Sequence, residues 1–187
     1  MTVHNKTRVR IDLEPDAMNY QQFEAFNHLK PEQIQDFLKV GKQGTIAASK
    51  RILKQNVLCR QIIFLLEGEV QVSLETSKGE HTLSTISAPT VLGEISFFSG
   101  EPSSATVTTL TQIKVLVIDF DVLRQRLIEG DRVTALILLN MSQALAKRAS
   151  TMTRQLSEFY VKQQEMETQV SEVQHASTAI FGEWSFI

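Results

Sequence analysis

This sequence has a single cysteine, a small net charge and no long apolar run, and each of these features excludes a class of protein. Cys59 is the only cysteine among 187 residues, so no internal disulfide framework can form, and a reducing cytoplasm is the expected compartment. With 19 basic and 21 acidic residues, the net charge of -2 gives no general attraction to nucleic acid or to an anionic membrane surface. The longest apolar runs, such as "ALILL" at residues 135–139, are far too short to cross a bilayer. The polar first 16 residues also lack the apolar stretch of a signal peptide.

The residue patterns of common enzyme sites are missing too. A metal-dependent jelly-roll enzyme would need histidine and carboxylate ligands that converge on one site. The histidines are instead scattered, and no pair has ligand spacing: His4, His28, His81 and His175. No Gly-x-Ser-x-Gly elbow, phosphate-loop lysine or zinc-binding helix motif occurs either. We therefore expect a non-enzymatic protein without catalytic residues or a bound metal.

Composition divides the chain into segments of different kinds. Phenylalanine and leucine recur at three- and four-residue steps between Phe23 and Leu38, which predicts two short helices, the second opening at Pro31. From about Thr45 to Phe120, short runs rich in Ile, Val, Leu and Thr are broken by Gly, Asn, Ser and Pro. This pattern is typical of an antiparallel β-sandwich or roll. The expected segments are a polar extension, a β-roll domain with leading helices, a long helix and an apolar tail, at residues 1–20, 21–130, 131–175 and 176–187.

Single residues mark the expected turns and helix ends. Gly68 predicts a tight turn between two strands, because a positive φ costs little only for glycine. Asp119 or Asp121 is the expected N-cap of a short helix that stops at Gly130. Asp131 follows directly and is the expected N-cap of the long helix.

The long helix carries the strongest periodic signal in the chain. No glycine or proline occurs between Gly130 and Gly182, and residues 131–175 would reach roughly 65 Å as one helix. Nine of the eleven positions on one seven-residue seam are apolar, the exceptions being Ser142 and Gln163. This narrow stripe is typical of a coiled coil. Its positions are Leu138, Ser142, Leu145, Ala149, Met152, Leu156, Phe159, Gln163, Met166, Val170 and Val173.

Two interpretations of this stripe are open. Between Val133 and Ala149 it can pack on its own β-roll domain, but a domain of this size cannot also cover Phe159 and the positions beyond it. Residues 138–173 are therefore expected to form a homodimer with a second copy, most simply a parallel two-fold pair. Gln163 within the seam would then help to set the register at some cost in stability.

The ordered motifs of residues 26–148 resemble the cyclic nucleotide-binding domain family, and the catabolite activator type in particular because of the long helix. The matching stretches are, in order, "FNHLKPEQIQDFL", "IIFLLEGEVQV", "VLGEISFFSGEPSSATV" and "IKVLVIDFDVLRQRL". The resemblance implies a mainly β fold, an antiparallel jelly roll (double-stranded β-helix) flanked by helices and followed by the coiled-coil helix. It also implies a regulatory module for signal transduction that binds cyclic AMP, cyclic GMP or a related anionic ligand.

The resemblance assigns the ligand site to residues 91–107. Gly93 would let the backbone pass close to the nucleotide, and Glu94 would accept a hydrogen bond from the ribose hydroxyl. Backbone N–H groups of the next turn would hold the cyclic phosphate, and binding would draw Ile95 and its aromatic neighbours inward. The family adds an arginine and two small residues for the phosphate, and these positions here hold Ser103, Ser104 and Ala105.

The missing arginine is the main departure from the family. A hydrogen bond from a charged donor contributes about 1.5–3 kcal/mol, so its loss predicts weak binding or a changed ligand preference rather than none. Two family glycines are also replaced, one near Asn56 and one by Thr90, and asparagine tolerates a positive φ better than threonine does. The alternative is a degenerate pocket in which Glu94 caps its own loop, and the chain then acts as a ligand-free dimerisation scaffold.

The long helix and the tail carry the last expectations. The family's base-contacting positions correspond to residues 148–153, so Arg148 and Thr153 are candidate ligand contacts, the alternative being a solvated helix face. The tail is too short and too poor in basic residues to read DNA. It either folds back onto its own domain or docks onto an unknown protein partner, through Ile180, Phe181, Trp184, Phe186 and Ile187.

Overall fold

A computed structural model describes residues 20–182 of the chain, with side-chain surroundings through residue 170. The described part divides into two compact units, with the boundary between Ala144 and Leu145. The first unit holds the described strands and short helices, and the second is the later part of one long helix, α4 (Arg132–Gly182). Within the described range, no helix combines the length and the apolar character needed to cross a membrane.

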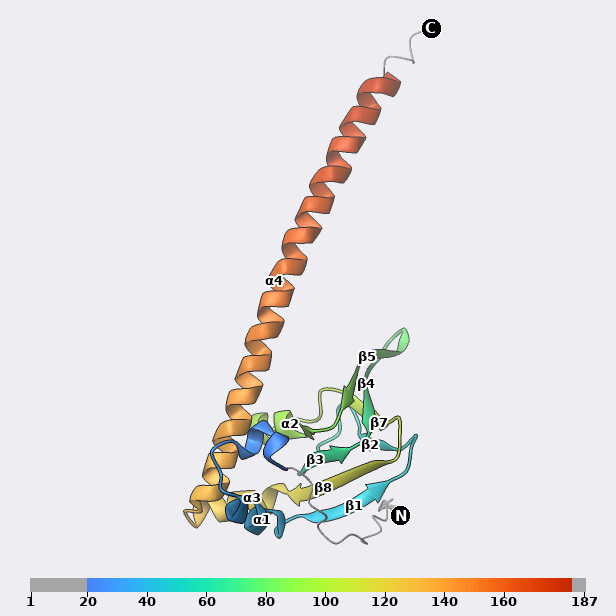
Figure 1. Ribbon diagram of the computed structural model, residues 1–187. Helices are drawn as coiled ribbons and strands as arrows, with labels where there is room; N and C mark the ends of the chain where they lie inside the picture. The colour runs from blue at the N-terminus through green and yellow to red at the C-terminus, as the bar shows by residue number, and fades with distance from the viewer. Residues whose placement is uncertain (1–19, 183–187) are drawn as a thin grey trace. The chain divides into compact units, whose positions relative to one another are not determined.

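The described strands form two four-stranded antiparallel sheets in the first unit (Figure 1). The order of the first sheet is β1-β8-β3-β6, and that of the second is β2-β7-β4-β5. The predicted jelly roll with flanking helices is thereby confirmed. The strands are β1 (Lys42–Ile46), β2 (Arg51–Leu53), β3 (Gln61–Glu67), β4 (Glu69–Thr76), β5 (Gly79–Ser87), β6 (Thr90–Leu92), β7 (Thr106–Thr109) and β8 (Ile113–Asp119).

The two faces of β3 explain why this strand reads as an unbroken apolar run. Ile63 and Leu65 belong to the core between the two sheets, whereas Ile62 and Phe64 belong to the core under the helices. Successive residues of a strand point to opposite faces, so a strand that is covered on both sides needs apolar residues at every position. Residues Ile62–Leu65 are all buried, as this arrangement requires.

The segment before α1 (Pro31–Leu38) differs from the predicted first helix. It forms two single 3₁₀ turns, η1 (Tyr20–Gln22) and η2 (Glu24–Phe26), because Phe23 between them has extended angles, φ -81° and ψ 124°. The break brings the rings of Phe23 and Phe26 onto the phenylalanine of β3, with ring centroids 5.7 and 5.3 Å away. The structure thus has two 3₁₀ turns where the sequence predicts the first of two short helices, and α1 is the predicted second helix that opens at Pro31.

The residues predicted for one strand turn and for one helix start, Gly68 and Asp119, have different outcomes. Gly68, between β3 and β4, has a φ of +91°, and a Cβ there would lie 2.7 Å from the carbonyl oxygen of Gln112. Asp119 stands at the N-cap position of α3 (Phe120–Ile128) but makes no capping hydrogen bond. Its carboxylate instead accepts a hydrogen bond from Nε2 of Gln61, at 2.8 Å. Asp119 is thus the N-cap residue by position, as predicted, but its side chain does not cap the helix.

β5 lies at the edge of the second sheet, and its side chains are almost all exposed. It pairs with β4 along its length, but the register shifts between Val72 and Ser73, where Leu83 of β5 has no opposite residue. One extra residue in a strand is a β-bulge, which interrupts the ladder and bends the strand locally.

The first turns of α4 belong to the first unit and close its helical core. Ile137 and Leu138 are buried in the cluster that contains the N-terminal phenylalanines. Asn140 is buried as well, and its Nδ2 donates to two main-chain carbonyls, that of Ala25 at 3.1 Å and that of Asn27 at 2.8 Å. Hydrogen bonds as well as apolar contacts therefore fasten the start of α4 to the N-terminal turns.

Asn140→Ala is expected to lower the free energy of unfolding by about 2–3 kcal/mol, because truncation leaves two carbonyls without their buried donor. Urea denaturation followed by circular dichroism measures the change. Gln143→Ala removes an exposed amide from the same helix and is expected to stay within about 0.5 kcal/mol of the native chain. Equal stabilities of the two variants would contradict the bonding role of Asn140.

Candidate ligand-binding site

The segment between β6 and β7 is a short helix bracketed by two glycines. α2 (Glu94–Ser99) has 6 residues, with Gly93 before it at φ 84° and Gly100 after it at φ 76°. Both glycines have the left-handed backbone that other residues rarely adopt. Residues 93–105 thus form one compact turn–helix–turn segment, called the cassette below.

Gly93 is required by space as well as by its backbone angle. A Cβ on Gly93 would lie 2.5 Å from the carbonyl oxygen of Gln61, at the start of β3. No side chain fits at that distance, since the obstacle is main chain and cannot rotate away. By contrast, a Cβ on Gly100 would meet nothing within 4 Å. Gly93 therefore allows a close approach between the cassette and β3, whereas its predicted approach to a nucleotide stays a prediction.

Glu94 follows in the first turn of α2 and is buried, with only 7% of its surface exposed. Burial of a carboxylate is costly unless it is compensated, and Glu94 is engaged in interactions within the chain. An acidic residue in the first turn of a helix also gains from the helix dipole. This placement is compatible with both roles predicted for Glu94, accepting from a ribose hydroxyl and holding its own loop.

Ser103, which stands where the family has arginine, is tied to a neighbouring loop. Its N–H donates to the carbonyl of Val57 at 3.1 Å, and its carbonyl accepts from the N–H of Asn56 at 2.9 Å. Its Oγ donates to the carbonyl of Ala105 at 2.8 Å. Each polar group of Ser103 therefore already has a partner within the chain, and the side chain is buried.

The two replaced family glycines have different outcomes. Asn56 has a φ of 60°, so it does occupy the left-handed region that asparagine tolerates. Thr90 instead begins β6 and pairs with Leu65 of β3, and it is not among the described residues with a positive φ. Thr90 therefore does not need the positive φ that threonine tolerates poorly, because a strand gives it the extended angles that a β-branched residue favours.

The cassette contacts α3 through Phe97 of α2. The ring of Phe97 lies edge-on to that of Phe120, with centroids 4.9 Å apart, and the guanidinium carbon of Arg124 lies 6.0 Å from the centre of the Phe97 ring. Ile95 and Phe98, on the same short helix, are exposed. The cassette is thus packed directly on the helix that precedes α4, and the predicted ligand contact of Ile95 stays a prediction.

The other predicted contacts fall in two places. Ser104 is exposed and Ala105 is half-buried, and both lie in the cassette. Arg148 and Thr153 are exposed residues of the second unit. The hydroxyl of Thr153 donates to the carbonyl of Ala149 at 3.1 Å, within its own helix. The structure brings the cassette residues together, whereas a ligand contact of the two helix residues stays a prediction.

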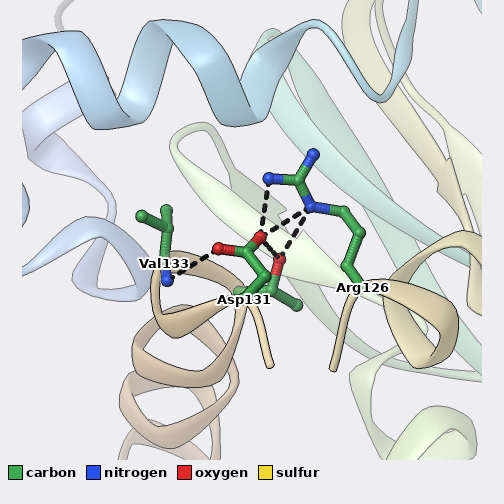
Figure 2. Close-up of polar contacts among 4 residues, drawn as sticks. Arg126, Asp131 and Val133 are labelled. Atoms are coloured by element: carbon green, nitrogen blue, oxygen red, sulfur yellow. Dashed lines mark hydrogen bonds and ion pairs between the residues drawn. The ribbon is translucent and has the colours of Figure 1, made fainter. Parts of the chain in front are cut away.

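The loop between α3 and α4 holds a polar network that the sequence predicts only in part (Figure 2). Asp131 caps α4 as predicted, since its Oδ1 accepts the N–H of Val133 at 3.0 Å. Its Oδ2 accepts from the hydroxyl of Thr134 at 2.7 Å, and from Nη2 and Nε of Arg126 at 2.6 and 2.7 Å. Arg126 was not a candidate because it belongs to α3, on the other side of the break at Gly130, where φ is 81°.

The charge state of Asp131 links this network to pH. Burial raises the pKa of Asp131, but hydrogen bonds from Thr134, Arg126 and Val133 and the positive charge of Arg126 lower it by more, so the pKa lies below its ordinary value. A carboxyl group with a depressed pKa stabilises the folded state above its unfolded-state pKa. That contribution is lost as the pH falls through the folded-state pKa.

Asp131→Asn is expected to lower the free energy of unfolding at neutral pH by about 1–3 kcal/mol, because a charged acceptor of several hydrogen bonds is lost. The amide does not titrate. The difference in unfolding free energy between native chain and variant is therefore expected to shrink below about pH 4 and to disappear at still lower pH. Urea denaturation at a series of pH values measures it. Asp121→Asn is the control, because the Asp121–Arg60 pair is exposed and such pairs contribute little. A difference that is independent of pH would contradict the role of the Asp131 charge.

Cys59 and the possible metal ligands can be assessed within the part of the chain that the structure describes. Cys59 is half-buried, with its Sγ 3.4 Å from the carbonyl oxygen of Gln61. Burial raises the pKa of this thiol and the backbone contact offsets only part of the rise, so the unreactive thiol form persists at neutral pH. Among the residues that the structure describes, no group of three or more His, Cys, Asp or Glu side chains could hold a metal ion.

Comparison with known proteins finds a family model that matches the part of the chain containing the cassette. Residues 44–129 match the family model described as "Cyclic nucleotide-binding domain". Among curated relatives, cGMP-dependent protein kinase 2 of Mus musculus is 31% identical over 122 residues, which cover 63% of this chain and 15% of the kinase. A CRP-like cAMP-activated global transcriptional regulator of Mycobacterium tuberculosis is 24% identical over 88 residues, 46% of this chain and 39% of the regulator. The chain therefore spans well under half the length of these relatives.

Solved structures share the fold of this chain. The catabolite activator protein of Thermus thermophilus superposes with a TM-score of 0.64 at 21% identity, covering 72% of this chain and 62% of that protein. A cyclic nucleotide-binding domain from Methylobacillus flagellatus superposes with a TM-score of 0.62 at 22% identity, covering 67% and 71%. At these identities the likeness establishes the jelly-roll fold.

Proposed function

We propose that this chain, whose residues 44–129 belong to the cyclic nucleotide-binding domain family, is a non-enzymatic cytoplasmic sensor that binds cyclic AMP or cyclic GMP at the cassette. The observation that carries the proposal is the arrangement of Gly93 and Glu94. A left-handed glycine lies against β3, and a buried carboxylate follows it at the start of α2. This is the arrangement that the family's ribose site requires, and it lies inside the matched residues.

The cassette would hold the phosphate without a cation of its own. Glu94 would accept from the ribose hydroxyl, and the hydroxyl of Ser104 and the N–H of Ala105 would donate to the phosphate, near the exposed Ile95. Ser103 offers no guanidinium, and its polar groups have partners already. Loss of one charged donor weakens binding by roughly ten- to a hundredfold, so weak binding of a cyclic nucleotide is the expected behaviour.

Isothermal titration calorimetry of the native chain with cyclic AMP and with cyclic GMP tests this proposal. Saturable heat is expected for at least one of them, and weaker or no heat for linear 5′-AMP, which lacks the ring phosphate. No saturable heat at millimolar ligand, from a chain whose circular dichroism shows an intact fold, would overturn the sensor. That result would favour the alternative, a ligand-free scaffold, which the internally satisfied Ser103 also supports.

We propose further that binding is relayed from α2 to α3 and then to α4. The contact of Phe97 with Phe120 joins the first two helices, and the hydrogen bonds between Arg126 and Asp131 join α3 to the cap of α4. A ligand shifts such an equilibrium only by its differential affinity for the two arrangements. Weak binding of the phosphate therefore predicts that the ligand shifts the equilibrium between the two arrangements only modestly.

The output of this relay is proposed to be a homodimer through residues 138–173, in which Leu138 is buried in its own unit and the exposed seam positions farther along α4 face the second copy. The exposed apolar side chains of the second unit support this, with Met152 68% and Phe159 63% exposed in the single chain. Phe159→Ser is expected to weaken the dimer by at least about tenfold, because a large apolar side chain leaves the interface. Sedimentation equilibrium measures the change, and Val161→Ser, which is exposed but off the seam, serves as the control. A monomeric native chain, or equal effects of the two variants, would contradict the dimer.

Contacts made by the tail and by two helix residues are also proposals. Residues 183–187 and the side chains beyond residue 170 lie outside the described part, so the predicted protein partner of the apolar tail rests on sequence alone. The proposed ligand contacts of Arg148 and Thr153 rest on the family resemblance.

A further inference from the structure

Six seam positions of the second unit form an exposed stripe, called the distal seam. An exposed apolar stripe of this kind marks a surface that packs against another helix. Its apolar residues alone do not determine which helix packs there, in which direction, or in which register. The polar residues in and beside the stripe can determine all three. The distal seam consists of Met152, Leu156, Phe159, Gln163, Met166 and Val170, all exposed in the single chain.

Gln163 distinguishes one register from the others. In a parallel, unstaggered pair of identical helices, each seam residue of this class lies opposite its own copy. Gln163 then meets Gln163 of the second copy, and the two amides can hydrogen-bond to each other. In a shifted or antiparallel pair the amide faces an apolar residue such as Met166 or Leu156, and an unpaired polar group in an apolar contact is costly.

Lys162 and Glu167 distinguish the direction. They flank the distal seam on opposite sides, and in a parallel pair a residue in the position of Lys162 faces the residue five places on in the other helix. That residue is Glu167, and two-fold symmetry makes the contact twice. In an antiparallel pair like flanks meet, so the flank of Lys162, which also carries Arg148, would meet another basic flank.

The contacts within one chain leave this pairing available. Among the described residues, no ion pair joins Lys162 to its own chain. The carboxylate of Glu167 accepts a hydrogen bond from Nε2 of Gln163 at 3.2 Å. Glu167 is thereby held beside the seam position that Gln163 occupies, and Lys162 of a second copy would reach it there.

We propose that the distal seam pairs with a second copy of this chain in parallel and without stagger, fixed by the facing Gln163 amides and by two Lys162–Glu167 ion pairs between the chains. This inference rests on the proposed homodimer, for which the sequence already favours a parallel pair, and it adds the absence of stagger and the contacts between the chains that fix direction and register.

Cysteine cross-linking in a Cys59→Ala background tests direction and register. Leu156→Cys and Val170→Cys, each made alone, are both expected to form disulfide-linked dimers under mild oxidation, because each position meets its own copy within the reach of a disulfide. An antiparallel pair can bring at most one of the two positions to its own copy. Val161→Cys, on the outer face, is the control, expected to cross-link about tenfold less.

Charge reversal tests the ion pairs. Lys162→Glu and Glu167→Lys are each expected to weaken the dimer about tenfold, because each turns two attractions into repulsions. An equimolar mixture of the two variants is expected to recover native affinity, since the mixed dimer restores opposite charges at both contacts. Sedimentation equilibrium at low and high salt measures the affinity of each dimer, and high salt is expected to reduce the loss caused by each charge reversal.

The outcomes separate this inference from the proposals before it. Cross-linking at both seam positions, together with recovery in the mixture, supports it. A dimeric protein that cross-links at one seam position only, or a mixture as weak as its components, overturns this inference and leaves the dimer standing. A monomeric native chain overturns both, and none of these results depends on whether the cassette binds a cyclic nucleotide.

Discussion

Ser103→Arg is expected to tighten the binding of cyclic AMP or cyclic GMP about ten- to a hundredfold. A guanidinium offers a planar fork of donors that matches phosphate oxygens, and the native cassette has no such group. The main-chain bonds of Ser103 to Asn56 and Val57 do not involve the side chain, so the only hydrogen bond that the substitution removes is that of Oγ to Ala105. The longer arginine side chain has to extend out of the buried position of the serine. Titration calorimetry against both nucleotides measures the gain.

Two controls test whether the gain in affinity depends on the position of the new charge and on the phosphate of the ligand. Ser104→Arg adds the same charge one residue later, at an exposed site, and is expected to give a much smaller gain that falls with salt. Adenosine has no phosphate and should bind both variants as it binds the native chain. A folded Ser103→Arg protein without any gain would show that the cassette is not shaped for a cyclic phosphate, and the scaffold alternative would then be preferred.

Gly93→Ala is expected to lower the free energy of unfolding by about 3 kcal/mol or more and to abolish the heat of nucleotide binding. Two costs combine at this position. A non-glycine residue at a φ of 84° is strained, and its Cβ would lie 2.5 Å from the carbonyl oxygen of Gln61. Since that oxygen belongs to the main chain of β3, relief requires the cassette to move away from the strand.

Gly100→Ala is the matched control at the other end of α2. Its φ of 76° is similar, but nothing lies within 4 Å of the added Cβ, so only the backbone cost of about 1–2 kcal/mol is expected. Thermal and urea denaturation of both variants measure the difference, which reports the close approach itself. Equal losses in the two variants would show that the contact of Gly93 with β3 contributes nothing to stability.

The β-roll could be predicted from the sequence because its signals are local. β3 is covered on both faces and reads as an unbroken apolar run, and Gly68 marks the turn into β4. The order of the motifs then indicated the family, and the resemblance assigned ligand-binding roles to Gly93, Glu94 and Ser103, which stay predictions. Asp131 was predictable as a cap because a cap lies next to the helix that it starts.

The features that the sequence did not predict depend on contacts between distant residues. Asp119 has the right position for a cap, but Gln61, 58 residues earlier, takes its carboxylate. Phe23 has the spacing of a helix, yet its edge-on contact with Phe64 of β3 accompanies two 3₁₀ turns instead. Arg126 reaches Asp131 across a break in the helix, and no spacing rule predicts that contact. Each of these outcomes was decided by packing against another element rather than by local preference.

The bulge at Leu83 has a consequence for solubility. An edge strand exposes a row of free backbone donors and acceptors, which can template the growth of aggregates. Opposite β4, the extra residue bends β5 and breaks the even spacing that an incoming strand would have to match. The chain therefore leaves a nine-residue edge strand exposed to water. The bulge makes the free edge of this strand irregular, so a strand of another molecule cannot pair with it along its whole length.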